Sequence, residues 1–314
     1  ALLLLAQSGS RRNCEVVGIG LGSMALVRFS RLPLMPLIVA REKLARGDRP
    51  REVGGEPAIM DEPQGVREYD EFGTGGETGV HTFSARAISR LSPEGATCVD
   101  LGCGSGRLLS RLARGRPDAT IIGFDLSEPM LETGRQNLER EGLGERVRLR
   151  HADIRSFDAE LDESPDVVSC NFALHHMPDE DDARRCLEAI ARVRERSGCA
   201  VWIFDFARLR NPGTWPAFCT LVNWPGPVVH SDAIESEKAA FSEEEMVRLL
   251  DETGLADLNH VRSRPLREQQ VHWAPGRDRP HPNTGLWRDV PVPPGARTLV
   301  LLALASFPRS LSSV

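Results

Sequence analysis

The chain has 314 residues, 40% of them hydrophobic and 27% charged, which is an ordinary balance for a soluble globular protein of one large or two small domains. A formal net charge of -6 without a dense lysine or arginine block gives no general attraction to polyanions, so we expect a small-molecule partner rather than nucleic acid. The seven cysteines are scattered, odd in number and free of any C-x-x-C pair, which favours a reducing, cytoplasmic compartment.

The first 79 residues are expected to lie outside the main domain. Residues 1–34 are an N-terminal extension of uncertain status, because their apolar tract is interrupted by arginine and proline and predicts neither a membrane span nor a signal peptide. A glycine alternation at 16–22 is interpreted as incidental. Residues 35–79 are charged and rich in glycine and proline, and they predict a segment of loop and short helices that covers the active site.

A helical pattern at 80–91 opens the main domain, which is expected to span 80–314. The run at 96–101 consists of small and β-branched residues, as in a buried strand, and it ends in Gly102, Gly104 and Gly106. Apolar residues then recur at the spacing of one helical face, so the unit is a strand, a glycine loop and a helix. A loop of this kind lets a ligand lie against bare backbone.

Strands and helices alternate from here, which favours a parallel sheet with helices on both faces. Ser127 and Ser242 are typical helix N-caps, and Gly198 is typical of a helix end. An irregular stretch rich in proline and tryptophan, at about 206–240, predicts a lid-like insertion. After the strand at 96–101, further strands are predicted at 120–125, 147–151, 166–170, 199–205, 255–261 and 298–306.

The spacing around the glycine loop indicates which ligand it suits. A dinucleotide fingerprint begun at Gly102 needs a small residue at position 107, where this chain has Arg107. Asp100, just before the first glycine, would repel a pyrophosphate but would suit a ligand that carries an ammonium group and a sulfonium. The stretch Asp100-x-Gly102-x-Gly104-x-Gly106 resembles motif I of the class I S-adenosylmethionine-dependent methyltransferases.

This resemblance covers about residues 80–306 and implies an α/β fold: a Rossmann-like seven-stranded sheet with helices on both faces, in which strands six and seven form the final antiparallel pair. It implies S-adenosyl-L-methionine as cofactor and S-adenosyl-L-homocysteine as product. Asp125, at the end of the second strand, is placed to accept hydrogen bonds from ribose hydroxyls, and Asp153 matches the family position that binds the adenine amino group. The expected cofactor-binding residues are Asp100, Gly102, Cys103, Gly104, Gly106, Asp125, Leu126, Met130, Asp153, Ile154, Asn171, Phe172 and Ala173.

The end of the fourth strand resembles motif IV of the small-molecule methyltransferases, and two histidines follow it. Ligands of parallel sheets bind outside the carboxyl ends of the strands, which places His175 and His176 close to the chemistry. An imidazole titrates near neutrality and can take a proton from the acceptor, so both are candidate catalytic residues. The sequence does not separate the two, and a structural hydrogen bond to backbone is the alternative role.

Four residues in the two segments expected to close over the cofactor are candidates for the substrate cavity, with packing as the alternative role. They are Tyr69, His81, Trp215 and Trp224. No metal site is expected, because the adjacent histidines have no visible third ligand.

The expected function is methyl transfer from S-adenosylmethionine to a small organic acceptor with an oxygen, nitrogen or carbon nucleophile. The alternatives are a non-catalytic module that binds S-adenosylmethionine, a nicotinamide-dependent oxidoreductase, and a methyltransferase that acts on RNA or protein. No association with membranes is expected. The sequence leaves the acceptor, the methylated atom and the oligomeric state open.

Overall fold

The computed structural model describes residues 33–54, 60–74, 78–221, 224, 226–277, 290 and 307. The glycine alternation at 16–22 and nearly all of the N-terminal extension lie outside these residues. The helices are α1 (Met35–Leu44), α2 (Pro63–Thr74), α3 (Thr78–Leu91), α4 (Arg107–Gly115), α5 (Glu128–Arg140), α6 (Glu180–Ser197), α7 (Thr214–Cys219), α8 (Pro227–Ala239) and α9 (Glu243–Glu252), with the short 3-10 turns η2 (Phe157–Ala159) and η3 (Leu174–His176). The strands are β1 (Thr97–Leu101), β2 (Thr120–Asp125), β3 (Val147–His151), β4 (Val167–Asn171), β5 (Ala200–Phe206), β6 (Asn259–Arg262) and β7 (Gln269–Ala274).

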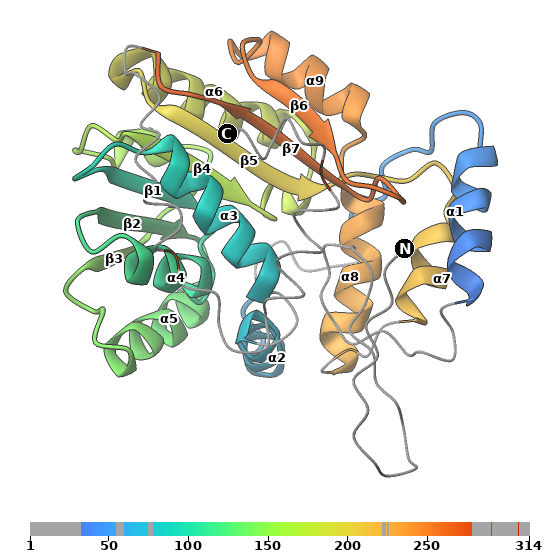
Figure 1. Ribbon diagram of the computed structural model, residues 1–314, viewed down its shortest axis with the longest axis horizontal. Coiled ribbons are helices and arrows are strands. Elements are labelled where there is room, and N and C mark those ends of the chain that lie inside the picture. Colours follow the sequence, from blue (N-terminus) through green and yellow to red (C-terminus); the bar gives the residue numbers. More distant parts are fainter. Residues whose placement is uncertain are drawn as a thin grey trace.

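The seven strands form one sheet in the order β3-β2-β1-β4-β5-β7-β6. Strands β1 to β5 are parallel, whereas β7 runs antiparallel to both β5 and β6. Helices α3, α4 and α5 cover one face of the sheet, and α6 and α9 cover the other (Figure 1). All residues of β5 are buried, because a parallel strand between two helical layers has no face in water. The predicted fold class is confirmed.

Local sequence signals position the helices as expected. The Ser127 side chain caps α5 by accepting a hydrogen bond from the Met130 amide at 3.2 Å. Ser242 and Glu245 form a reciprocal capping box at the start of α9. Gly198 ends α6 in the left-handed conformation that favours glycine. These caps set where each helix begins or ends relative to the sheet.

The last strand differs from the prediction at 298–306, a run that lies outside the described residues. Strand β7 is Gln269–Ala274, which lies between the strands predicted at 255–261 and 298–306. The buried Gln270 of this strand is hydrogen-bonded: its Nε2 donates to the carbonyls of Phe206 and Phe241, both at 2.9 Å. Because these partners lie far away in the sequence, a search for apolar runs misses the strand.

Helices α1, α2, α7 and α8 come from the two segments expected to cover the active site, 35–79 and 206–240. Together they bury a third apolar cluster that includes Phe72, Trp215 and Phe218. Helix α2 also packs against α3, α4 and α5, so it joins this cluster to the helices that cover one face of the sheet. The domain boundaries remain a prediction. Within the part of the chain that is described, no helix is both long and apolar enough to cross a membrane.

Candidate active site

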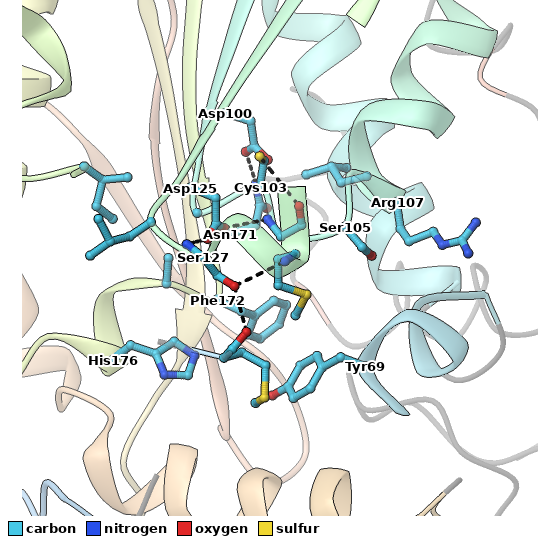
Figure 2. A pocket seen from close by; sticks show the side chains of 18 of the residues that line it. Tyr69, Asp100, Cys103, Ser105, Arg107, Asp125, Ser127, Asn171, Phe172 and His176 are labelled. Atoms are coloured by element: carbon cyan, nitrogen blue, oxygen red, sulfur yellow. Dashed lines mark hydrogen bonds between the residues drawn. The ribbon is translucent and has the colours of Figure 1, made fainter. Parts of the chain in front are cut away.

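A cavity of about 290 Å³ lies at the carboxyl ends of β1, β2 and β4, and α2 contributes to its wall (Figure 2). This edge of a parallel sheet is where ligands bind in such folds. Predicted site residues that line the cavity are Tyr69, His81, Asp100, Gly102, Cys103, Gly104, Asp125, Leu126, Met130, Asp153, Ile154, Asn171, Phe172, Ala173 and His176. Predicted residues outside its lining are Gly106, His175, Trp215 and Trp224.

The glycine loop turns its backbone toward β2 and the cavity. The amides of Gly102 and Cys103 both donate to the Phe124 carbonyl, at 2.8 and 3.0 Å. Gly102 has a φ of 70°, and a Cβ at this position would lie 2.5 Å from the Cβ of Ala173. A side chain at position 102 is therefore disfavoured by the backbone conformation and also blocked by Ala173, which follows β4. The loop presents bare main chain to the cavity.

Asp125 ends β2 and is held by the loop opposite it. Its Oδ2 accepts from the Gly104 amide at 2.7 Å, and its Oδ1 accepts from the Ser127 amide at 2.9 Å. Each carboxylate oxygen has a second lone pair, so the side chain keeps capacity for two further donors. Burial raises the pKa of this carboxyl group above its ordinary value, although the backbone amides of Ser127, Gly104 and Leu126 oppose the shift. Donors on a ligand would stabilise the buried charge.

Asp100, at the end of β1, is almost fully buried and is held by neutral side chains. Its Oδ1 accepts from Ser169 Oγ at 2.6 Å and from Asn171 Nδ2 at 3.0 Å. Burial raises the pKa of Asp100 to about 7, and the Asp125 charge adds to the shift. Asn171 is fixed in turn by Trp202 Nε1, which donates to its Oδ1 at 3.2 Å. Two acids, one buried and one partly buried, thus line the same cavity, an arrangement that favours a cationic ligand.

Asp153 differs from these two acids because it is paired with a cation. Arg155 Nε lies 2.9 and 2.8 Å from its two carboxylate oxygens, and these bonds lower the pKa of Asp153. The same guanidinium reaches Asp182 at 2.9 Å. Asp153 and Ile154 line the cavity together, as predicted, but the arginine already satisfies part of the carboxylate.

The two histidines after β4 have different surroundings. His175 is buried outside the cavity lining, and its Nδ1 lies 2.5 Å from Asp205 Oδ1. His176 lines the cavity (Figure 2), and its ring stacks at a centroid distance of 4.1 Å on that of His175. Burial, with the charges of His175 and Arg51, lowers the pKa of His176 well below its ordinary value. The imidazole that faces the cavity is therefore neutral at physiological pH.

Aromatic side chains gather at the end of the cavity away from Asp100 (Figure 2). Tyr69 on α2 lines it and donates its hydroxyl to Asp232 on α8. Phe172 has an unusual φ of 51° for a residue with a side chain, and its ring packs on Phe204 and Phe206. This backbone conformation turns the ring into the cavity wall.

His81 on α3 lines the cavity, while the two predicted tryptophans do not. Burial, with the charges of Arg111 and Arg107, lowers the pKa of His81 to about 3. Trp215 is fully buried and donates to the Ala233 carbonyl at 2.6 Å. Trp224 donates to the Cys219 carbonyl and packs on Phe72. Both tryptophans fix the α7–α8 region.

Several residues at the site were not expected from sequence. Arg107 was considered only as a misfit to a dinucleotide motif, yet it lines the cavity and binds Asp70 on α2 through Nε and Nη2 at 2.8 and 2.6 Å. Arg51 donates to the carbonyls of His175 and Met177, at 2.8 and 2.6 Å. No local sequence pattern links Arg51 or Asp70 to the site, because their partners are distant in the chain. Other lining residues of this kind are Met60, Gly73, Ser105, Leu108, Ser127, Arg155, Met177 and Pro178.

Comparison with known proteins agrees with this geometry. Residues 98–198 match a family described as a methyltransferase domain. The chain is similar to trans-aconitate 2-methyltransferase of Variovorax paradoxus, with 38% identity over 89 residues that cover 28% of this chain and 32% of that relative. It is also similar to ubiquinone biosynthesis O-methyltransferase of Nitrosomonas europaea, with 32% identity over 120 residues that cover 38% of this chain and 46% of that relative. The match thus spans less than half the length of either relative.

Among solved structures, the plantazolicin methyltransferase BpumL in complex with SAH has the same fold. Its TM-score is 0.53 at 11% identity, and the superposition covers 79% of this chain and 98% of that one. The strand order, the cavity at the carboxyl ends of the parallel strands and the matched domain agree with each other. Residues 98–198 therefore match a methyltransferase domain, and the described sheet has the fold of the class I S-adenosylmethionine-dependent methyltransferases.

Proposed function

We propose that the cavity binds S-adenosyl-L-methionine and that the protein transfers its methyl group to a small organic acceptor. The observation that carries this proposal is the buried Asp100 and the partly buried Asp125, side by side at a bare glycine loop. Neutral donors hold both carboxyl groups. A ligand with an ammonium group, a sulfonium and ribose hydroxyls would add positive charge and further hydrogen-bond donors to these two acids.

The residues present fit that ligand. Asp125 retains lone pairs for two ribose hydroxyls, and Asp100 offers negative charge to the amino-acid part. Leu126 and Met130 supply apolar surface for the adenosine, beside Ile154. Bound S-adenosylmethionine would supply a methyl group on cationic sulfur, which an acceptor lone pair takes as the carbon–sulfur bond breaks to leave S-adenosylhomocysteine.

His176 is the residue that we assign to proton removal. It faces the cavity and is neutral, so a ring nitrogen can accept the proton that the acceptor loses on methylation. His175 instead holds the turn: Asp205 Oδ2 accepts from the amides of Leu174 and His175, at 2.9 and 3.2 Å, while its Oδ1 binds the His175 ring. The buried pair therefore positions the turn that carries His176.

Two alternative functions fit the site less well: a nicotinamide-dependent oxidoreductase and a non-catalytic module that binds S-adenosylmethionine. A pyrophosphate at the glycine loop would face Asp100 and Asp125, and Arg107 is already bound to Asp70. A non-catalytic module would need neither His176 at the cavity nor the aromatic end beyond it.

We also keep the expectation of a cytoplasmic protein, which the six free, buried cysteines of the described residues support.

The test is transfer of labelled methyl from S-adenosylmethionine to a panel of small acceptors. At least one acceptor should gain label, and His176→Ala should lower its turnover by about 100-fold or more with little change in cofactor affinity. Binding of S-adenosylhomocysteine without turnover on any acceptor would favour the non-catalytic module. Full activity of His176→Ala would remove this residue from the chemistry.

A further inference from the structure

The chemistry of the acceptor can be inferred from the aromatic end of the cavity, which we call the acceptor end and define by Tyr69, His81, Phe172 and His176. Figure 2 shows Tyr69, Phe172 and His176 together, away from Asp100. Tyr69 and Phe172 also both pack against the apolar cluster of α1, α2, α7 and α8. The rings of the acceptor end thus come from α2, from α3 and from the segment that follows β4.

The cationic side chains that line the cavity are engaged by carboxylates. Arg107 makes two bonds to Asp70, and Asn137 Nδ2 donates to the same carboxylate at 2.7 Å. Arg155 binds Asp153 and Asp182. Within the described lining, Arg107 and Arg155 are the only lysine or arginine side chains. An acceptor carboxylate would therefore have to break one of these ion pairs.

The remaining polar groups at the acceptor end are neutral or negative. The Tyr69 hydroxyl is turned to the Asp232 carboxylate, which adds negative charge behind the ring. Burial lowers the pKa of His81 to about 3 and that of His176 well below its ordinary value, so both imidazoles are uncharged at neutral pH. Neutral imidazoles accept hydrogen bonds from hydroxyl donors, whereas a buried carboxylate without a cation is strongly disfavoured.

We propose that the acceptor is an uncharged aromatic molecule with a ring hydroxyl, and not a carboxylic acid. This inference rests on the proposed function of the same cavity. Rings stack on the aromatic wall, the hydroxyl meets His176, and the paired arginines offer no site for a carboxylate. The similarity to a trans-aconitate methyltransferase does not extend to the acceptor on this account, because trans-aconitate is a tricarboxylate.

The experiment measures acceptor binding to the full chain saturated with S-adenosylhomocysteine, by calorimetry at pH 7.5. The probes are methyl 3,4-dihydroxybenzoate, 3,4-dihydroxybenzoate and trans-aconitate; the first two share the dihydroxyphenyl ring, and one carries a neutral methyl ester where the other carries a carboxylate. The neutral ester should bind at least about tenfold more tightly than either carboxylate. Equal or tighter binding of a carboxylate, or no binding of the ester, would overturn the inference.

A second set of measurements tests whether the ester binds in the cavity. Tyr69→Ala should weaken ester binding by about tenfold or more, and Tyr69→Phe, which keeps the ring, should weaken it less. Equal affinity of wild type and Tyr69→Ala would show that the ester binds elsewhere and would contradict the inference. Absence of S-adenosylhomocysteine binding in the first titration would overturn the proposed function, and the inference with it. Tight S-adenosylhomocysteine binding with a preference for carboxylates would overturn the inference alone.

Discussion

His175 and Asp205 form a buried pair in which the imidazole Nδ1 lies 2.5 Å from the carboxylate Oδ1. The second carboxylate oxygen accepts from two backbone amides, so one aspartate fixes both the ring and the turn. His176, the next residue, faces the cavity instead. The two neighbouring histidines thus differ in their surroundings: His175 is held in a buried pair, and His176 lines the cavity.

The first prediction compares alanine variants of these neighbours. His175→Ala should lower the free energy of unfolding by about 1–3 kcal/mol, because Asp205 loses a buried partner. His176→Ala should change stability less and methyl transfer more. Denaturant unfolding and single-turnover assays check both, and the reverse pattern would assign the chemistry to His175.

The second prediction concerns the pH dependence of cofactor binding. With a pKa of about 7, Asp100 is mostly protonated at pH 6 and mostly ionised at pH 8. Because only the ionised form attracts the ligand's ammonium group, S-adenosylhomocysteine should bind up to about tenfold more weakly at pH 6 than at pH 8. His81, with a pKa of about 3, does not titrate in this range. Calorimetry at the two pH values measures the difference, which Asp100→Asn should abolish; a rise in affinity at low pH would contradict this role of Asp100.

The third prediction uses two glycines with similar backbone angles. Gly102 has a φ of 70° and Gly95 a φ of 69°, but a Cβ at Gly95 meets nothing within 4 Å. Gly95→Ala should cost about 1 kcal/mol of stability from the left-handed conformation alone. Gly102→Ala should cost about 1–3 kcal/mol more, because its methyl group meets Ala173 at 2.5 Å, and it should weaken S-adenosylhomocysteine binding. Similar losses for both variants would show that the contact with β4 is unimportant.

The fourth prediction assigns Arg51 a positioning role through the turn that carries His176. It donates to the carbonyls of His175 and Met177 and lies over the Phe241 ring, 4.1 Å from its centroid. Arg51→Ala should lower kcat for methyl transfer by about tenfold, with little change in KM for S-adenosylmethionine. A loss confined to KM would place Arg51 at the cofactor instead.

The sequence was sufficient for the parts of the molecule that depend on local patterns. Strands β1, β2, β4 and β5 are largely apolar runs that end in turns, and β3 alternates apolar and basic residues. Asp100, Gly102 and Asp125 follow from their places at strand ends. Strand β7 could not be found in this way, because Gln270 is polar yet buried through hydrogen bonds to carbonyls far away in the chain. His272 is buried beside it, with its Nε2 3.1 Å from Gln270 Oε1.

Contacts between distant residues also explain what the sequence could not resolve at the site. Nothing near His175 indicates that Asp205 holds it, so the two histidines could not be separated. Arg107 meets Asp70 only after α2 has packed beside α4. Trp215 and Trp224 lie in a stretch whose proline- and tryptophan-rich composition is typical of the wall of a binding site. Their indole groups instead donate hydrogen bonds to backbone carbonyls within the α7–α8 region.

The central claim is that Asp100, Asp125 and the glycine loop form a site for S-adenosylmethionine. The most direct measurement is calorimetric titration of the wild type and Asp125→Ala with S-adenosylhomocysteine, and of the wild type with NAD. The wild type should bind S-adenosylhomocysteine at one site and NAD not at all, and Asp125→Ala should bind about 1–3 kcal/mol more weakly through lost hydrogen bonds to charged oxygen. Binding of NAD in place of S-adenosylhomocysteine, or equal affinity of the two proteins, would contradict the account.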